Sequence, residues 1–348
     1  MSATSTGVYH RSYRADMALR ATRIEYFRLA LLAAAVVAAP YLVSAYWLHV
    51  LNDIGIAVIG AIGLNILVGY TGQISLGQAG FLAVGAYTAG LISIHSSLPP
   101  LAGIVLAALV SAAVGAFFGL PALRLKGLYL AIATLASQVI ITWAIIHWQF
   151  LGAGEPLVIT EPTSFFGWIP VTDKQWYWVI AVCATLAAVV ATNLFRTGVG
   201  RAFVAIRDQD IAAEAIGVDT ARYKIIAFAL SSGFAGVAGA LTAYWTTILT
   251  WERFTIDVSI AYLAMIIIGG LGSVSGSVYG AIFIVAVPAW LTQLGNDFSG
   301  VISPQNLPAI QLIIFGLSIA LFLVFEPKGL ARIWQRSKDY FRLWPFRY

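Results

Sequence analysis

Apolar residues run along the chain in long blocks that short polar stretches separate. Many of these blocks approach the ~20 residues that an α-helix needs to cross a bilayer. The pattern predicts an all-α fold, namely a polytopic bundle of about ten transmembrane helices. The predicted spans lie at residues 29–48, 54–68, 77–92, 101–118, 128–148, 176–195, 225–245, 259–269, 276–291 and 307–325.

The predicted membrane domain takes in residues 29–325 and leaves two tails, residues 1–28 and 326–348. Composition supports this division, because 60% of the residues are hydrophobic and only 10% are charged, against roughly 25% charged residues in a soluble domain. The single cysteine, Cys183, rules out a disulfide within the chain and a CxxC motif. We expect a retained first helix and not a cleaved signal peptide, since a long Arg-rich stretch precedes a full-length apolar block.

The basic residues predict the orientation of the bundle. With a cytoplasmic N-terminus and ten spans, every Lys and Arg except Lys174 and Arg253 falls on the cytoplasmic side, as the positive-inside rule requires. Both termini are therefore predicted to be cytoplasmic, as is the long loop at residues 196–224. This distribution explains the net charge of +5 without a nucleic-acid partner.

Residues 63–80 crowd glycines and uncharged polar groups between two apolar blocks. A break of this kind is tolerated in lipid only where protein or a water-filled path lines it. Gly69, Gly72, Ser75 and Gly80 recur two hundred positions later as Gly269, Gly272, Ser275 and Gly280. Paired interrupted helices in a transporter point to the substrate path, whereas glycine-mediated helix packing is the alternative interpretation.

We predict interrupted, Gly-rich helices at both positions and a translocation path between them. The side chains and glycines predicted along this path are Asn65, Gly72, Gln73, Ser75, Gln78, Gly272 and Ser275. Three polar residues of the fifth span are weaker candidates, because hydrogen bonds between helices explain them better; they are Thr134, Ser137 and Gln138.

Several chemistries lack the residues that they require. No Asp or Glu falls at the centre of a predicted span, although a proton-driven carrier commonly needs an ionisable group there. The four histidines are scattered, so neither a metal site nor a catalytic triad is predicted. The phosphate-binding loop G-x-x-x-x-G-K-[ST] is also absent. We expect a transport subunit without a cofactor, not an enzyme, in which a partner supplies energy or the path is passive.

The loop at residues 196–224 contains a predicted short helix from Asp208 to Gly217. Asp208 suits the N-cap, and Gly217 suits the left-handed position that ends a helix. Such a helix, about 12 Å long at ~1.5 Å per residue, is suited to docking into a groove on a soluble partner; an amphipathic helix resting on lipid headgroups is the alternative. The predicted coupling residues are Arg207, Asp208, Ile211, Glu214, Ala215 and Gly217.

Three ordered motifs resemble those of one transporter family. The run GYTGQISLG at residues 69–77, followed by GAYT at 85–88, is similar to the signature of LivM-like permeases of branched-chain amino acid ABC importers. Residues 200–224 resemble their coupling loop, and IGGLGSVSG at 268–276 matches a third block. The resemblance implies a bacterial inner-membrane subunit that carries leucine, isoleucine or valine. Its implied partners are a second related permease, two cytoplasmic ABC ATPases and a periplasmic binding protein.

Two departures from the family pattern bear on the substrate. Residues 151–156 read LGAGEP where the family usually has a T-G-G-x-x-G-like outer loop, and Gln78 stands where the family often has His. Related importers of urea and short amides therefore stay open as an alternative. A stand-alone carrier or channel, which needs no ATPase, is the other alternative.

Overall fold

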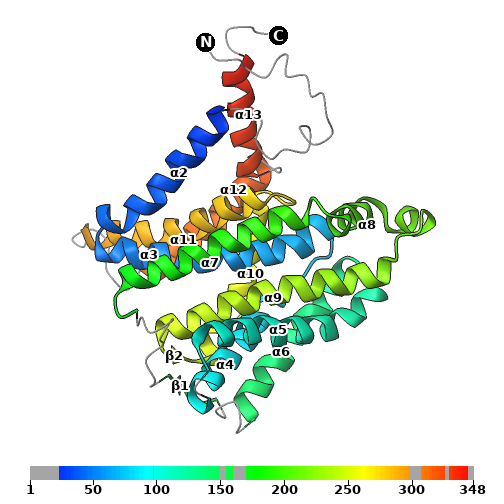
Figure 1. The fold of residues 1–348 in the computed structure, drawn as a ribbon, viewed down its shortest axis with the longest axis horizontal. Coiled ribbons are helices and arrows are strands. Elements are labelled where there is room, and N and C mark those ends of the chain that lie inside the picture. Colours follow the sequence, from blue (N-terminus) through cyan, green and yellow to red (C-terminus); the bar gives the residue numbers. More distant parts are fainter. Residues whose placement is uncertain are drawn as a thin grey trace.

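A computed structural model describes residues 23–96, 98–148, 154–159, 170–297, 307–325 and 329–343, and nearly all of them are helical (Figure 1). The first half contains α2 (Arg23–Leu42), α3 (Ala45–Asn65), the π-helical turn η1 (Ile66–Tyr70), α4 (Gln78–His95), α5 (Pro100–Gly119), the short turn η2 (Leu120–Leu123) and α6 (Leu128–His147). The second half contains α7 (Asp173–Leu194), α8 (Gly198–Ala215), α9 (Thr220–Thr246), η4 (Trp251–Phe254), α10 (Ile256–Gly269), α11 (Val274–Asp297), α12 (Leu307–Phe325) and α13 (Leu330–Leu343).

Six segments within the described ranges are long and apolar enough to cross a membrane, so the chain is a polytopic helical membrane protein. These segments are Ala45–Tyr70, Pro100–Gly119, Leu128–His147, Asp173–Leu194, Thr220–Thr246 and Val274–Gly295. All ten apolar blocks of the sequence fall on helices. The predicted helical class is confirmed, whereas the count of ten crossings stays a prediction.

One predicted span boundary is wrong. The first predicted span, residues 29–48, runs across a break: α2 ends at Leu42, and Ser44 has an extended backbone that caps a new helix from Ala45. The hydropathy pattern missed this break because Tyr41 to Tyr46 keep it largely apolar. In addition, the predicted C-terminal tail holds helix α13. Most of the predicted N-terminal tail, residues 1–22, lies outside the described residues.

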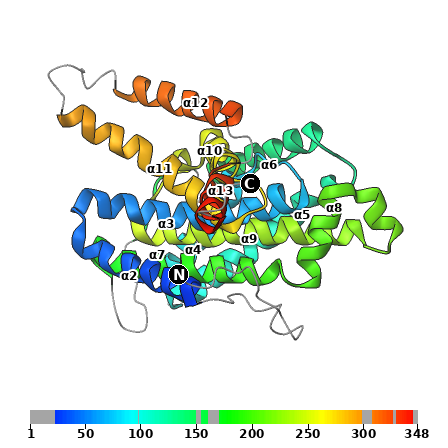
Figure 2. The same cartoon turned by 90° about the horizontal axis from the view of Figure 1, so that it is seen from above.

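Helix α9 lies at the centre of the bundle and packs against α3, α4 and α5 (Figures 1 and 2). Small residues permit this closeness: a Cβ at Gly85 of α4 would overlap the backbone of Gly236, and a Cβ at Gly239 would overlap the carbonyl oxygen of Leu82. Close helix packing, the alternative explanation of the glycines, therefore applies along α9. The long helices run roughly parallel, and α12 lies to one side of them (Figure 2).

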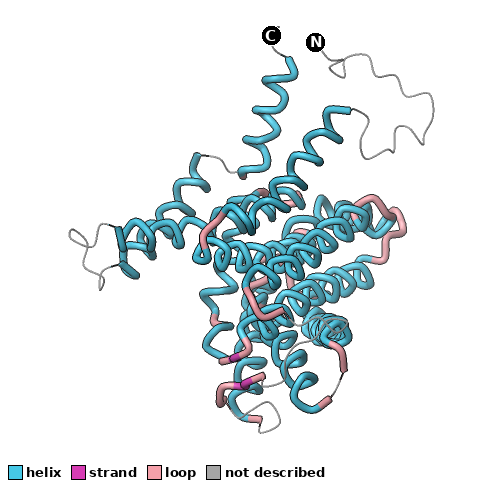
Figure 3. Tube along the Cα trace, turned by 60° about the vertical axis from the view of Figure 1, so that its left-hand side comes forward, coloured by secondary structure: helices cyan, strands magenta, loops and turns pink. Residues whose placement is uncertain are grey.

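Two connecting segments, one after α6 and one after α9, form a small strand pair (Figure 3). Strand β1 (Leu157–Val158) pairs antiparallel with β2 (Ile248–Leu249), with Leu157 opposite Leu249. This pair lies at the end of the bundle away from α8 (Figure 1). The all-α prediction did not contain these two strands of two residues each.

Candidate translocation and coupling site

The two glycine segments are turns that connect consecutive helices. The first connects η1 to α4, and the second connects α10 to α11. Gly72 and Gly272 occupy the same place in the two turns, with φ of +71° and +72°, a conformation that residues with a Cβ adopt only at a cost. The predicted interruption thus lies between helices and not within one.

The two turns touch each other although two hundred residues separate them in sequence. A Cβ at Gly69 would overlap the side-chain oxygen of Asn65 and the backbone nitrogen of Gly272. Only a glycine at this position lets the two turns approach so closely. The repeated motif therefore forms one site, and we name Val68 to Gly77 the first glycine turn and Gly270 to Ser273 the second.

Asn65 holds the second glycine turn against α3. Its amide nitrogen donates to the Ser273 carbonyl oxygen at 2.8 Å and to Ser277 Oγ at 2.7 Å, and its Oδ1 accepts from the Gly272 N–H at 2.9 Å. The side chain is only 1% exposed. Asn65 was predicted to line a path; here it is buried, and its hydrogen bonds join α3 to the second glycine turn.

Arg207 of α8 contacts both glycine turns. Its Nη1 donates to the Gly69 carbonyl oxygen at 3.3 Å. Cβ atoms added at Gly72 and Gly272 would lie 3.2 Å from Arg207 Cγ and Nη1, respectively. The other side of the guanidinium forms an ion pair with Asp208 at 2.9 Å. One side chain of the predicted coupling helix therefore reaches the backbone of both repeats.

Helix α8 is longer than predicted and consists of two parts. It begins at Gly198, and the non-helical backbone of Gln209 (φ −164°, ψ 104°) divides it. The prediction that Asp208 caps a new helix is therefore wrong by one residue, because the break falls at Gln209. We name Gly198 to Asp208 the inner part of α8 and Asp210 to Ala215 the outer part.

The predicted end of α8 at Gly217 is confirmed. Gly217 has φ of +92°; its N–H donates to the Glu214 carbonyl oxygen at 3.0 Å, and the Val218 N–H donates to that of Ala213 at 3.0 Å. These two bonds make the Schellman motif that ends many helices. In the outer part, Ile211 is 71% exposed and the neighbouring Ile216 is 78% exposed. Glu214 and Ala215 are exposed too.

Three charged residues brace α8 directly after its break. Asp210 forms ion pairs with Lys126 at 2.6 Å and with Lys224 at 3.5 Å, so it joins the loop before α6 to the start of α9. The hydrogen bond from Lys126 lowers the pKa of Asp210 below its ordinary value of 3.8, and the positive charges of both lysines add to this effect. Asp210 is therefore ionised at neutral pH, and its ion pairs are formed.

A polar cleft of about 310 Å³ opens between the first glycine turn and α8. Thr71, Gly72 and Gln73 line one side of it, and residues 206–210 line the other. Gln73 is only 6% exposed, and its Oε1 has no hydrogen-bond partner in the described part of the chain. Of the predicted path residues, Gly72 and Gln73 thus border a cavity with charged walls.

The other predicted path residues lie in contacts between elements or on the surface. Gln78 donates to the Gly60 carbonyl oxygen at 2.9 Å, and Ser75 Oγ accepts from the Gly77 N–H at 3.4 Å; both side chains are buried. Ser275 Oγ lies 3.0 Å from Ser273 Oγ at an exposed position. These bonds stabilise the two glycine turns and the start of α4.

A buried polar network supports the start of α4. Ser259 Oγ donates to Gln138 Oε1 at 2.6 Å and accepts from the Ala79 N–H at 2.8 Å. Thr134 Oγ1 accepts from the Leu76 N–H at 2.9 Å, and Ser137 donates to the Thr134 carbonyl oxygen at 2.5 Å. The preferred interpretation of these fifth-span residues, hydrogen bonding within the bundle, is consistent with this geometry. Sequence reasoning missed Ser259, since a lone Ser in an apolar block gives no signal of its partner.

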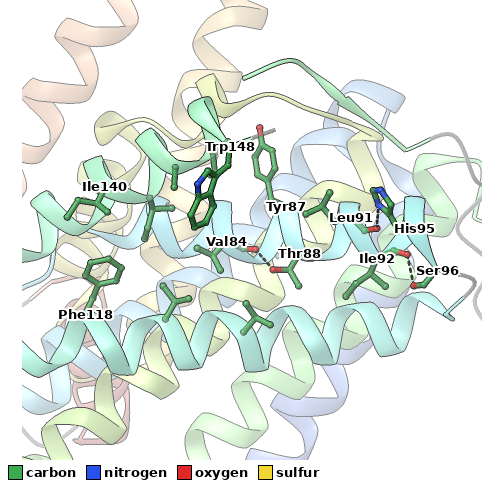
Figure 4. A pocket seen from close by; sticks show the side chains of 15 residues that line it. Val84, Tyr87, Thr88, Leu91, Ile92, His95, Ser96, Phe118, Ile140 and Trp148 are labelled. Atoms are coloured by element: carbon green, nitrogen blue, oxygen red, sulfur yellow. Dashed lines mark hydrogen bonds between the residues drawn. The ribbon is translucent and has the colours of Figure 1, made fainter. Parts of the chain in front are cut away.

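A larger groove of about 660 Å³ lies between α4, α5 and α6 and is almost wholly apolar (Figure 4). Two of its hydroxyl groups turn back to their own helix: Thr88 donates to the Val84 carbonyl oxygen at 2.7 Å and Ser96 to that of Ile92 at 2.8 Å. Tyr87 borders the groove, and its buried hydroxyl has no partner within the described ranges. An apolar molecule fits this groove, whereas the cleft beside α8 suits a charged or polar solute.

The structure is a bundle of apolar helices in which Arg207 of the partly exposed helix α8 contacts both glycine turns. This arrangement is that of a membrane permease. The chain belongs to the family of branched-chain amino acid transport system permease components, whose pattern matches residues 46–323. The permeases of this family are transport subunits and not enzymes.

Individual relatives agree with this assignment. The chain is 32% identical to the high-affinity branched-chain amino acid transport system permease protein LivM of Salmonella typhimurium, over 87% of this chain and 74% of the relative. It is 31% identical to LivM of Escherichia coli over the same shares. It is also 27% identical to the inner membrane ABC transporter permease protein YjfF of Escherichia coli, over 84% of this chain and 86% of the relative. No solved structure matches the chain.

Proposed function

We propose that the chain is the permease subunit of an ABC importer and forms part of the path for leucine, isoleucine or valine. The names of its LivM relatives support this substrate class. The proposed assembly adds a second related permease, two cytoplasmic ABC ATPases and a periplasmic binding protein. The proposed location is the bacterial inner membrane, with ten spans and both termini in the cytoplasm.

The contact of Arg207 with both glycine turns carries the proposed coupling mechanism. The outer part of α8 exposes Ile211 and Glu214 for a groove on an ATPase. Its ion pairs at Asp210 oppose free bending at Gln209. A displacement of the outer part therefore passes to Arg207, and from there to the turns that border the polar cleft.

Within this proposal, the residues of the two turns divide into two roles. Gly72 and Gln73 border the inner mouth of the path, where the polar cleft lies. Asn65 fixes the second turn, and Gln78 fixes the start of α4. Polar groups of this kind guide a zwitterionic solute briefly, while affinity resides in the binding protein.

Uptake by the reconstituted complex tests the function. Vesicles are loaded with ATP, and labelled leucine, urea or glutamate is presented with and without the binding protein. Leucine should accumulate only when ATP and the binding protein are both present. Accumulation by the purified chain alone under a proton or sodium gradient would show a stand-alone carrier, and ATP-dependent uptake of urea would overturn the substrate.

A cysteine pair tests the mechanical link between α8 and the first glycine turn. A Cβ at Gly72 would lie 3.8 Å from Arg207 Cβ, close to the mean of ~3.8 Å in disulfides. In a Cys183→Ser background, Arg207→Cys alone should lose uptake, because it removes the hydrogen bond to the Gly69 carbonyl oxygen. Oxidation of the Gly72→Cys, Arg207→Cys pair should restore part of this uptake, because the disulfide links α8 to the turn again, and reduction should remove it. A formed disulfide that leaves uptake at the level of Arg207→Cys alone would contradict transmission through this contact.

Charge reversal tests the docking surface of the outer part. Glu214 lies near the C-terminal end of α8, where the helix dipole disfavours an acid, so a basic group on the ATPase is its expected partner. Glu214→Arg should weaken co-purification of the ATPases. Glu252→Arg should not, because it is an exposed change in η4, which directly follows β2 at the end of the bundle away from α8 (Figure 1). Equal recovery of the ATPases with both variants would remove Glu214 from the interface.

A further inference from the structure

Helix α13 differs from the other helices in direction. It stands upright in Figure 1 and is seen end-on in Figure 2, while α3 and α9 run horizontally in both views. Its axis is therefore roughly perpendicular to the spans. If the spans cross the bilayer, α13 lies along the membrane plane.

The sequence of α13, LARIWQRSKDYFRL, suits a membrane surface and not a span. It holds four basic residues and one acidic residue, and it is strongly amphipathic. Arg332 and Arg336 are one helical turn apart, so they share a face, and both are exposed. Basic residues on one face and aromatic or aliphatic residues on the other characterise helices that lie in the interface.

The apolar face of α13 borders a groove against α11. This groove, about 360 Å³ in volume, is lined by Tyr279, Ile282 and Phe283 of α11 and by Leu330, Ile333 and Trp334 of α13. Trp334 is 60% exposed, and its ring centre lies 6.4 Å from that of Tyr279. Tryptophan is enriched at the level of lipid headgroups, which matches its place beside the two arginines.

We propose that α13 and α11 form a binding site for an anionic phospholipid. An acyl chain occupies the apolar groove, and the phosphate lies by Arg332 and Arg336. Charge complementarity selects this occupant, because the negative surface potential of anionic lipids attracts Lys and Arg close to a membrane. A second protein chain would have to desolvate both guanidinium groups to cover the same face.

The site also touches the second glycine turn. Gly329, the residue before α13, has φ of +75°, and a Cβ there would lie 2.6 Å from the backbone nitrogen and Cα of Gly270. The Gly329 carbonyl oxygen accepts from the Arg332 N–H at 3.0 Å. A lipid bound by α13 therefore contacts a helix whose start packs against Gly270 of the second glycine turn. For this reason the rate of transport should depend on the charge of the lipid headgroup.

Quenching of Trp334 fluorescence tests the site without any transport measurement. The full chain is placed in phosphatidylcholine nanodiscs, and brominated phosphatidylglycerol or brominated phosphatidylcholine is added in increasing amounts. The signal of interest is the quenching that Trp334→Phe removes. Phosphatidylglycerol should produce it at a lower mole fraction than phosphatidylcholine, and 1 M salt should reduce the preference because it shortens the screening length.

Charge-neutral variants complete the test. Arg332→Gln with Arg336→Gln should weaken the phosphatidylglycerol effect about 25-fold, at about five-fold per basic residue near the surface. Arg201→Gln, at an exposed arginine of α8, should leave it unchanged. Equal quenching by both lipids, or quenching by neither, would overturn the proposal. Because the signal needs neither ATP nor a solute, it stays measurable if the importer function fails.

Discussion

Replacement of Asn65 by Leu should loosen the second glycine turn by an amount that the structure allows us to calculate. The change removes three hydrogen bonds between α3 and residues 272–277. At ~0.6 kcal/mol for each bond between membrane helices, the loss is about 2 kcal/mol. A second estimate counts the polar groups that the change leaves without a partner. The Ser273 carbonyl oxygen still accepts from the Ser277 N–H, so the Gly272 N–H is the group that loses its partner. An unpaired buried donor costs about 1–3 kcal/mol, which agrees with the first estimate.

Asn52 provides the matched control, because it lies on the same helix and is just as buried. Its amide nitrogen donates to the Asp173 carbonyl oxygen at 3.2 Å, and its Oδ1 has no partner in the part of the chain that the structure describes. Asn52→Leu should therefore cost ~0.6 kcal/mol at most. Unfolding of both purified variants by a denaturing detergent measures the difference.

Asn65→Asp adds a second level to the same measurement. A carboxylate still accepts from the Gly272 N–H but donates to neither Ser273 nor Ser277. Its unfolding free energy should fall below that of the wild type, and uptake by the complex should fall with it. If Asn65→Leu and Asn52→Leu lose equal stability, the hydrogen bonds of Asn65 do not hold the turn.

Three other changes have expected outcomes. Gly72→Leu or Gly272→Leu should block uptake but not membrane insertion, because both glycines have positive φ and contact Arg207; normal uptake in both would contradict this. Gly217→Val should cost about 1 kcal/mol at the end of α8 and reduce ATPase stimulation by loaded binding protein, and full stimulation would remove α8 from coupling. Asp210→Asn should reduce uptake at all pH values tested. The wild type should keep its Asp210 ion pairs from pH 5 to 8. Their stabilisation is fully present above the ordinary Asp pKa of 3.8 and is lost only as the pH falls through the lowered pKa of Asp210. A midpoint of uptake near pH 6 that Asp210→Asn abolishes would refute this.

The sequence predicted the elements that depend on local pattern. Hydropathy located the apolar blocks, and Gly217 was placed correctly at the end of α8 because left-handed glycine is a strong local signal. The break at Ser44 was missed, since its neighbours are apolar on both sides. The start of α8 was also missed, because Gly198 and Gly200 look like loop residues until Gly200 packs against Phe195.

The candidate site depends on contacts that no local pattern contains. The repeat pointed to Gly72 and Gly272, but it could not reveal that Gly69 packs on the backbone of Gly272. Arg207 was assigned to a partner-facing helix, yet it also donates to the Gly69 carbonyl oxygen 138 residues away. Arg207 belongs to the partly exposed helix α8 and contacts both glycine turns, so a movement of α8 that carries Arg207 with it changes its contacts with both turns. The distance in sequence that hid this contact is what makes it suitable for linking the two halves of the chain.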